Sequence, residues 1–431
     1  MKKLILKYCL ITTLIFSLFS CSNGSGAGNY SGSSDDWLDD AVPSLYETYK
    51  DYFDYVGFAV EYNELSQTTV QKGLAKHTNH ITMGNEFKPQ FIMAWWGNDP
   101  EISGTFKASN GITIQTPKLK GFDTADAILT ICKNKGIKMR GHTLAWHSQT
   151  EDAFFCKGYK KSNALVSSDE MDARLEWYIK TVLEHVSKWE KDNNNGEHII
   201  WAWDVFNEVT PDGSGLLRTN SKWYQIYKNS DFLVHAFQYA NKYAPEDVKL
   251  VYNDYGGVYG TSLQAKHSSQ LELVNLILSH KNDDLPTRLD AMGLQSHYSV
   301  ITGKSVIEKE IQDFVSKGID VHITELDIGT FDNYDHSRDL VKTQNKQYNS
   351  LADAYKAFFK VYLQNRKTDS KHGVESITIW GLNDENTWLN APQNGQMQWL
   401  GNCAQYPLLF TKQNNNYYPK GAFFAVIDAV E

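Results

Sequence analysis

Residues 199–208 read IIWAWDVFNE, an apolar run that has the character of a buried β-strand and ends in a glutamate. Residues 319–327 read IDVHITELD and repeat the pattern with a second glutamate. Burial of an ionised group is unfavourable by several kcal/mol unless the group is paired or used. Glu208 and Glu325 therefore indicate two carboxylates that converge on one substrate. Glycoside hydrolysis is the main chemistry that uses two carboxylates and no metal ion.

Short apolar runs alternate with helical patterns along the chain from about residue 41. Eight strands are expected, at Tyr55–Val60, His80–Met83, Ile137–Leu144, Ile200–Phe206, Lys249–Tyr252, Ala291–Gln295, Val321–Thr324 and Ile377–Trp380. Between them, Thr124–Lys135 and Met171–Lys191 carry apolar residues at helical spacing. Strands that alternate with helices predict a parallel sheet. Eight such units without an interrupting linker predict an α/β fold, a (β/α)8 TIM barrel that forms a single catalytic domain.

Polar residues suited to handling a sugar follow nearly every expected strand. They are Asn85, Glu86, His142, Asn207, Glu208, Asn253, Asp254, Gln295, His297, Glu325, Asp327 and Trp380. In a barrel these strand ends share one face, which carries the active site. An Asn or Asp after a strand is more often a helix cap. Capping is the poorer explanation of the whole set, because His, Gln and Trp do not cap helices.

Both glutamate segments resemble the active-site strands of the family 10 glycoside hydrolases, the endo-β-1,4-xylanases. The sequence RGHTLAWHSQ at residues 140–149 is similar to the third-strand motif of that family, and GLQSH at 293–297 is similar to its Gly-x-Gln-x-His strand. The resemblance covers roughly residues 41–428. It implies an endo-acting hydrolase that cleaves internal β-1,4-xylosidic bonds with retention of configuration.

The resemblance also implies roles for individual residues. Glu208 would be the general acid/base and Glu325 the nucleophile, whereas the alternative is two glutamates in salt bridges at the barrel rim. Asn207 would bind the 2-hydroxyl of the sugar at subsite −1. His297, with Asp327 as its partner, would help to hold the nucleophile ionised.

The remaining expected contacts line the sugar subsites. His142, Trp146, Gln295, Trp380 and Trp388 would surround the sugar at subsite −1, although Trp380 could instead plug the barrel. Asn85 and Lys88 would bind the sugar at subsite −2. Asn253 would play a supporting, mostly structural part.

One position departs from the family pattern. The family has a glutamate where this chain has Gly84, so the carboxylate that would grip the sugar at subsite −2 is missing. Loss of one charged hydrogen-bonding partner could weaken this subsite by about 1.5–3 kcal/mol. The long segment at residues 89–119 carries Trp95 and Trp96, which could rebuild this side of the site or pack on the barrel. These changes leave open the same mechanism on another β-1,4-glycan or on short xylo-oligosaccharides.

Composition excludes several other partners. The formal net charge of −9 gives no reason to expect a nucleic acid. No Cys/His spacing predicts a metal site, and no cofactor is expected. The expected partner is xylan or a xylo-oligosaccharide, and the expected state is a monomer. A non-catalytic glycan-binding lipoprotein on an inactive barrel is disfavoured, because both carboxylates are present.

The first residues have the pattern of a bacterial lipoprotein. Residues 1–20 combine Lys2 and Lys3 with an apolar stretch and predict a signal peptide, followed by Cys21 as the lipidated residue. Residues 21–40 predict a flexible tether and residues 41–431 the catalytic domain. The protein is thus expected to be exported and lipid-anchored in the bacterial cell envelope, on the periplasmic or surface face of the outer membrane.

Three cysteines remain in the expected domain. Cys132 falls on a helical pattern and is expected to be a buried thiol. Cys156 and Cys403 fall in loops and could pair, a question that the sequence leaves open.

Overall fold

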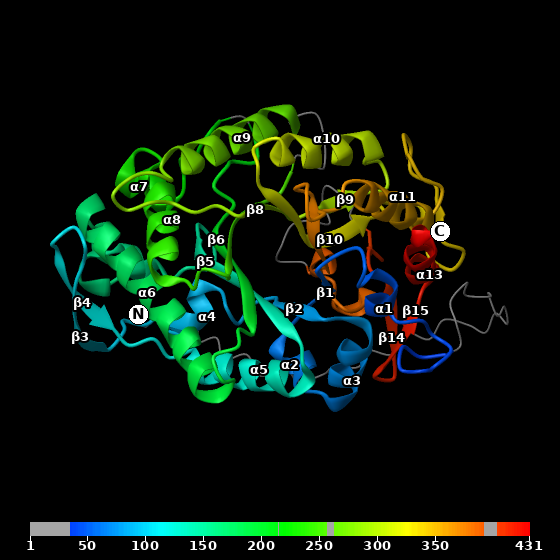
Figure 1. Cartoon of the computed structure of the whole chain (residues 1–431), viewed down its shortest axis with the longest axis horizontal. Coiled ribbons are helices and arrows are strands. Elements are labelled where there is room, and N and C mark those ends of the chain that lie inside the picture. The colour runs from blue at the N-terminus through cyan, green and yellow to red at the C-terminus, as the bar shows by residue number, and fades with distance from the viewer. Residues whose placement is uncertain (1–34, 214, 257–262, 392–402) are drawn as a thin grey trace, which may run out of the picture.

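Eight parallel strands close into a barrel in the computed structural model, which describes residues 35–213, 215–256, 263–391 and 403–431 (Figure 1). The strands are β1 (Tyr55–Val60), β2 (His80–Met83), β5 (Lys138–Trp146), β6 (Ile200–Asn207), β7 (Lys249–Asp254), β8 (Ala291–Leu294), β10 (Asp320–Gly329) and β13 (Val374–Ile379). Strand β1 closes the barrel because Gly57 pairs with His80 of β2 and with Thr378 of β13. The predicted (β/α)8 barrel is confirmed, and each predicted strand overlaps one of these eight.

Helices surround the strands (Figure 1). Those of the described residues are α1 (Leu45–Tyr49), α2 (Tyr62–Leu65), α3 (Thr68–His77), α4 (Pro89–Met93), α5 (Phe122–Lys135), α6 (Ser168–Asn193), α7 (Lys222–Tyr227), α8 (Asp231–Tyr243), α9 (Leu263–Ser279), α10 (Lys304–Val315), α11 (Leu351–Gln364) and α13 (Gly421–Ile427). Helix α6 begins after Ser167, whose side chain accepts a hydrogen bond from the backbone of Glu170. Helix α5 buries Cys132 and ends at Gly136, which adopts a φ of 65°. Cys132 is thus the buried thiol that the sequence predicts.

Four barrel strands, β5, β6, β7 and β10, run past the ends that their apolar pattern predicts. Strand β5 continues to Trp146, which pairs with Asn207 of β6. Strand β10 continues through Glu325 to Gly329, because a short extra strand, β9 (His297–Ser299), pairs with its end. The register of β9 places His297 opposite Asp327. Trp146 on β5 and Glu325 and Asp327 on β10 are therefore held on hydrogen-bonded strand rather than on loops.

Charged side chains lie inside the barrel below this face. Arg140 and Asp204, both buried, form an ion pair in which Arg140 Nε donates to Asp204 Oδ2 at 3.1 Å. Asp204 also lies 2.9 Å from Nδ1 of His142. Removal of either partner would leave an unpaired buried charge, which is strongly destabilising. This pair holds His142 by its Nδ1 and leaves its Nε2 facing away from Asp204.

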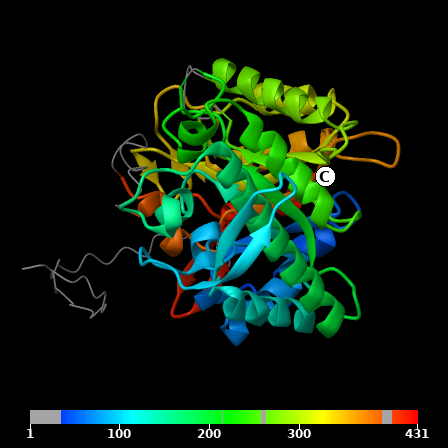
Figure 2. The same cartoon turned by 90° about the vertical axis from the view of Figure 1, so that its left-hand side faces the viewer.

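A hairpin of β3 (Ile102–Lys107) and β4 (Thr113–Pro117) lies outside the barrel against α6 (Figure 2). Its turn is fastened by Glu176, whose carboxylate accepts hydrogen bonds from the backbone N–H and the hydroxyl of Ser109, both at 2.6 Å. Before the hairpin, Trp95 is buried and donates to the carbonyl oxygen of Lys118 at 2.9 Å. Trp95 therefore packs on the barrel, whereas Trp96 is 55% exposed.

Two smaller hairpins complete the fold. They are β11 (Tyr334–Asp335) with β12 (Leu340–Val341), and β14 (Phe410–Gln413) with β15 (Asn416–Pro419). A contact with β15 shows that the packed domain begins earlier than predicted. Trp37, placed in the predicted tether, is buried and stacks on Tyr417 with ring centroids 4.5 Å apart. The packed chain thus begins at or before Trp37 rather than at residue 41.

The remaining observations concern membrane-spanning helices, the cysteines and the first residues. Within the ranges that the structure describes, no helix is both long and apolar enough to cross a bilayer. Cys156 is an unpaired thiol, so it does not form a disulfide with Cys403. The predicted signal peptide and Cys21 lie outside the described residues.

Candidate active site

Glu208 and Glu325 are linked by a row of amide side chains at the carboxyl-terminal ends of the barrel strands. Gln295 Nε2 donates to Glu208 Oε1 at 3.0 Å and to Asn207 Oδ1 at 3.3 Å. Asn253 Nδ2 donates to the same Asn207 oxygen at 2.9 Å and to Glu325 Oε1 at 2.8 Å. Both carboxylates thus face one small region above the barrel, and Asn253 has a more direct part in placing them than the sequence suggests.

Glu208 follows the last residue of β6 and has a φ of 56°, a conformation uncommon for residues other than glycine. Its Oε2 accepts a hydrogen bond from Trp146 Nε1 at 2.9 Å. Burial raises the pKa of Glu208, and the negative charges of Asp254 and Glu325 raise it further. These effects outweigh the hydrogen bonds from Gln295 and Trp146, so the protonated acid is favoured relative to an ordinary glutamate.

Glu325 has the opposite electrostatic environment. Burial alone would raise its pKa, but the hydrogen bond from His297 and the charges of His142 and His297 outweigh burial and lower the pKa. His297 Nε2 lies 3.3 Å from Glu325 Oε2, and its Nδ1 lies 3.1 Å from Asp327 Oδ2. Burial lowers the pKa of His297, but Asp327 and Glu325 raise it to about 10. A charged His297 therefore stabilises the ionised form of Glu325.

Aromatic rings enclose the same region. Trp388 Nε1 donates to Asp327 Oδ2 at 2.7 Å, and its ring centroid lies 4.8 Å from that of His297. Trp380 follows β13 and meets His142 edge-to-face at 5.5 Å. Its half-buried ring lies beside His142 and His297 at the strand ends, not in the centre of the barrel. The predicted set His142, Trp146, Gln295, His297, Trp380 and Trp388 thus surrounds the two carboxylates.

A second polar row extends from Trp146 across the ends of β2 and β5. Lys88 Nζ lies 5.1 Å from the ring centroid of Trp146 and donates to Gln149 Oε1 at 2.8 Å. Asn85 Oδ1 accepts from Gln149 Nε2 at 3.2 Å and from Lys88 Nζ at 3.3 Å. Burial lowers the pKa of Lys88, although Glu325 and Glu208 act in the opposite direction. Asn85, Lys88 and Gln149 are therefore joined in one row beside Trp146, and the binding of a sugar at subsite −2 by Asn85 and Lys88 stays a prediction.

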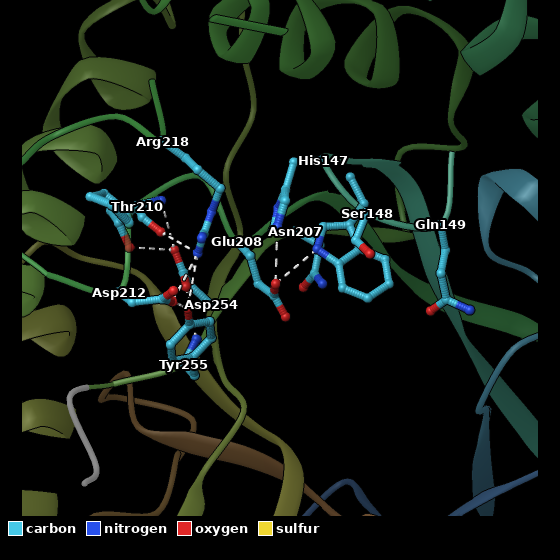
Figure 3. Close-up of polar contacts among 12 residues, drawn as sticks. His147, Ser148, Gln149, Asn207, Glu208, Thr210, Asp212, Arg218, Asp254 and Tyr255 are labelled. Atoms are coloured by element: carbon cyan, nitrogen blue, oxygen red, sulfur yellow. Dashed lines mark hydrogen bonds and ion pairs between the residues drawn. The ribbon is translucent and has the colours of Figure 1, made fainter. Parts of the chain in front are cut away.

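On the other side of Glu208 lies an ion-pair cluster of which the sequence signals only Asp254 (Figure 3). Thr210 Oγ1 donates to Asp254 Oδ2 at 2.8 Å, and Lys266 Nζ lies 3.1 Å from Asp254 Oδ1. Arg218 donates to the carbonyl oxygen of Thr210 and to Tyr255 Oη, each at 2.9 Å. Arg218 and Lys266 lie in loop and helix segments without a motif, so only the fold brings them to Asp254.

Figure 3 shows Glu208 between these two flanks, with Asp254, Arg218 and Tyr255 on one side and Gln149 on the other. His147 stands beside Glu208, with its Nδ1 3.9 Å from Glu208 Oε2. Burial lowers the pKa of His147 to about 4, and the charge of Arg218 acts in the same direction. A neutral His147 places no positive charge beside Glu208, so it does not oppose the raised pKa of that carboxyl.

The described residues contain no cluster of three or more side chains suited to hold a metal ion. Every predicted site residue within the described ranges lies on the active-site face or joins it through a hydrogen bond. The predicted lipidation site, Cys21, is outside those ranges.

The chain belongs to glycosyl hydrolase family 10. The model of that family matches residues 44–429. Among curated proteins, the chain is 31% identical over 402 residues to endo-1,4-beta-xylanase Y of Acetivibrio thermocellus, covering 90% of this chain and 32% of the relative. It is 32% identical over 389 residues to endo-1,4-beta-xylanase B of Butyrivibrio fibrisolvens, covering 90% of this chain and 53% of the relative. The chain thus spans about a third of the length of the first relative and about half of the length of the second.

Solved structures of this family share the barrel. The chain is 28% identical to TsXylA, an intracellular xylanase from Thermoanaerobacterium saccharolyticum, with a TM-score of 0.67 over 90% of this chain and 99% of that one. A variant of TsXylA with one glutamate replaced by alanine was solved in complex with xylotriose. Its fold and the fold described above are the same TIM barrel.

Proposed function

We propose that the protein is an endo-acting, retaining β-1,4-xylanase. The observation that carries the proposal is that two glutamates, linked by the amide side chains of Gln295, Asn207 and Asn253, have pKa values shifted in opposite directions. The pKa of Glu208 is raised and that of Glu325 is lowered. Two neighbouring carboxyl groups in different protonation states are what an acid and a nucleophile require. Family membership and the xylanase names of the relatives supply the substrate class.

In the first step, Glu325 attacks the anomeric carbon while Glu208 protonates the oxygen of the departing sugar. The bond to the leaving oxygen breaks as the glycosyl–Glu325 ester forms. Asn207 accepts its described hydrogen bonds through Oδ1, so its Nδ2 is the group that it can offer to the 2-hydroxyl. In the second step, Glu208 takes a proton from water, which displaces Glu325 and restores the original anomeric configuration.

The proposal is tested by measuring reducing-sugar release from xylan and from carboxymethylcellulose, with the anomeric configuration of the first product followed by NMR. We expect release from xylan and a β-configured first product. Release from carboxymethylcellulose alone would assign the same machinery to another β-1,4-glycan. Absence of release from both polymers and from xylo-oligosaccharides would favour a glycan-binding protein on an inactive barrel.

We infer that the protein acts outside the cytoplasm, attached to the cell envelope through lipidated Cys21. The lipoprotein pattern of residues 1–21 supports this inference. Replacing Cys21 with serine should move the protein from the membrane fraction to the soluble fraction of the producing cell, because the lipid acceptor is lost. Metabolic labelling with a fatty acid provides the direct measurement. An unlabelled wild-type protein would contradict the anchor and leave the catalytic proposal untouched.

A further inference from the structure

Glu61 stands where the side chain missing at Gly84 would otherwise project. It follows Val60 at the end of β1, and Gly84 follows Met83 at the end of the neighbouring β2. A Cβ placed on Gly84 would lie 3.5 Å from Cγ and 3.8 Å from Oε1 of Glu61. A methyl group would fit there in ordinary van der Waals contact, but a longer side chain would meet the Glu61 carboxylate. The glycine therefore leaves room for a carboxylate that arrives from the adjacent strand.

The Glu61 carboxylate joins the polar row that ends at the catalytic pair. Its Oε1 accepts a hydrogen bond from Asn85 Nδ2 at 2.6 Å. Asn85 in turn contacts Lys88 and Gln149, and Lys88 lies over Trp146, which donates to Glu208. Glu61 thus sits at the far end of a continuous row that starts at the acid/base.

The Glu61 side chain also caps the first turn of α2, where it accepts a hydrogen bond from the backbone N–H of Glu64. Glu61 is exposed, and none of the described Lys, Arg or His residues lies within ion-pair distance of it. By contrast, Glu176 and Asp254, which fasten parts of the structure, are buried and paired with Lys242 and Lys266. An exposed carboxylate accepts hydrogen bonds and donates none, so it suits a sugar hydroxyl that must donate.

We propose that Glu61 determines how the sugar at subsite −2 is held, by accepting a hydrogen bond from one of its hydroxyl groups in place of a side chain at position 84. Lys88 and Asn85 supply hydrogen-bond donors on the same row. The row therefore offers both donors and an acceptor to two neighbouring hydroxyl groups of a sugar. The proposal deepens the proposed xylanase activity and rests on it.

Aryl glycosides of different length test this role. An aryl β-xyloside fills only subsite −1, whereas an aryl β-xylobioside also fills subsite −2. Glu61→Ala should lower kcat/KM on the xylobioside roughly 10- to 100-fold, the effect of losing a hydrogen bond to a charged group. The same variant should leave kcat/KM on the xyloside within about twofold, because nothing at subsite −1 changes. Glu272→Ala, an exposed glutamate on α9, is the matched control and should change neither substrate.

A carboxylate exchange separates sugar binding from support of Asn85. Gly84→Glu alone should lower kcat/KM on the xylobioside, because two like charges then crowd one place. The double variant Glu61→Ala/Gly84→Glu should recover most of the loss, since one carboxylate again faces the sugar.

Three outcomes would overturn the role of Glu61. They are an equal loss on both aryl substrates, no loss on the xylobioside, or a double variant no better than Glu61→Ala. Failure of the proposed xylanase activity itself would be recognised separately, because the wild-type protein would then cleave neither aryl substrate nor xylan.

Discussion

Replacing Glu325 with alanine should lower kcat on xylan by a factor on the order of 10⁵ to 10⁶, the size of effect seen when a covalent catalyst loses its nucleophile. The physical reason is that no other described group can take its place. His297 is held by Asp327, and Asn253 offers only an amide to the anomeric carbon. The measurement is turnover of xylan and of an aryl β-xylobioside.

Azide or formate distinguishes loss of the nucleophile from loss of the fold. The space left by Glu325 admits a small anion, which attacks the anomeric carbon once while Glu208 still protonates the leaving oxygen. One displacement in place of two gives a product of inverted configuration, which NMR identifies. A Glu325→Ala variant with near wild-type turnover of xylan would disprove the assignment. A folded variant that no anion rescues, and that still binds xylo-oligosaccharides, would place the nucleophile elsewhere.

Replacing Glu208 with alanine should have an effect that depends on the leaving group. On xylan, kcat/KM should fall about 10²- to 10⁴-fold, because the departing alkoxide needs a proton. On an aryl glycoside with an acidic phenol, the loss in the first step should be less than about tenfold, since that phenolate leaves without help. Hydrolysis of the glycosyl–Glu325 ester would then limit turnover, and azide should accelerate it without a general base. Equal losses on both substrates would contradict the role of Glu208 as the acid.

The pH profile supplies a second test of Glu208. Its pKa is raised above the ordinary 4.5, so the protonated acid persists to higher pH and activity falls as pH rises through that pKa. The pKa of Glu325 is lowered below 4.5, so activity falls at the acidic end as pH drops through that value. In Glu208→Ala, the alkaline decline of kcat/KM on a good aryl substrate should disappear and the acidic decline should stay. An unchanged alkaline decline would assign it to another group.

The sequence predicted the barrel and most of its active-site face for an identifiable reason. Each strand is a short apolar run, and the residue types that follow it are unusual for loops, as with Gln295 and His297 after β8. The pattern does not contain strand β9, because three residues are too few to show a period. Yet β9 is what sets His297 opposite Asp327.

Residues that act through tertiary contacts were missed for a related reason. Arg218 contacts Thr210 and Tyr255, and no motif in its segment signals this role. Gln149 ends the quoted third-strand segment, but only the fold brings its amide to Asn85 and Lys88. The start of the domain was placed too late because a single Trp37 in a polar segment carries no periodic signal. Its burial against Tyr417 depends on a hairpin nearly 400 residues away.

The sequence by itself determined the fold class, the two glutamates and the family, because strand period and motif spacing are local properties of the chain. Only the tertiary structure decided the opposite directions in which the pKa values of those glutamates shift, since burial and the charges of Asp254 and His297 come from other strands. It also decided what Gly84 means. In the sequence, Gly84 shows only that a carboxylate is missing. In the fold, the absence of a side chain at Gly84 leaves room for the carboxylate of Glu61. The reason is that neighbouring barrel strands bring together residues that the chain keeps 23 positions apart.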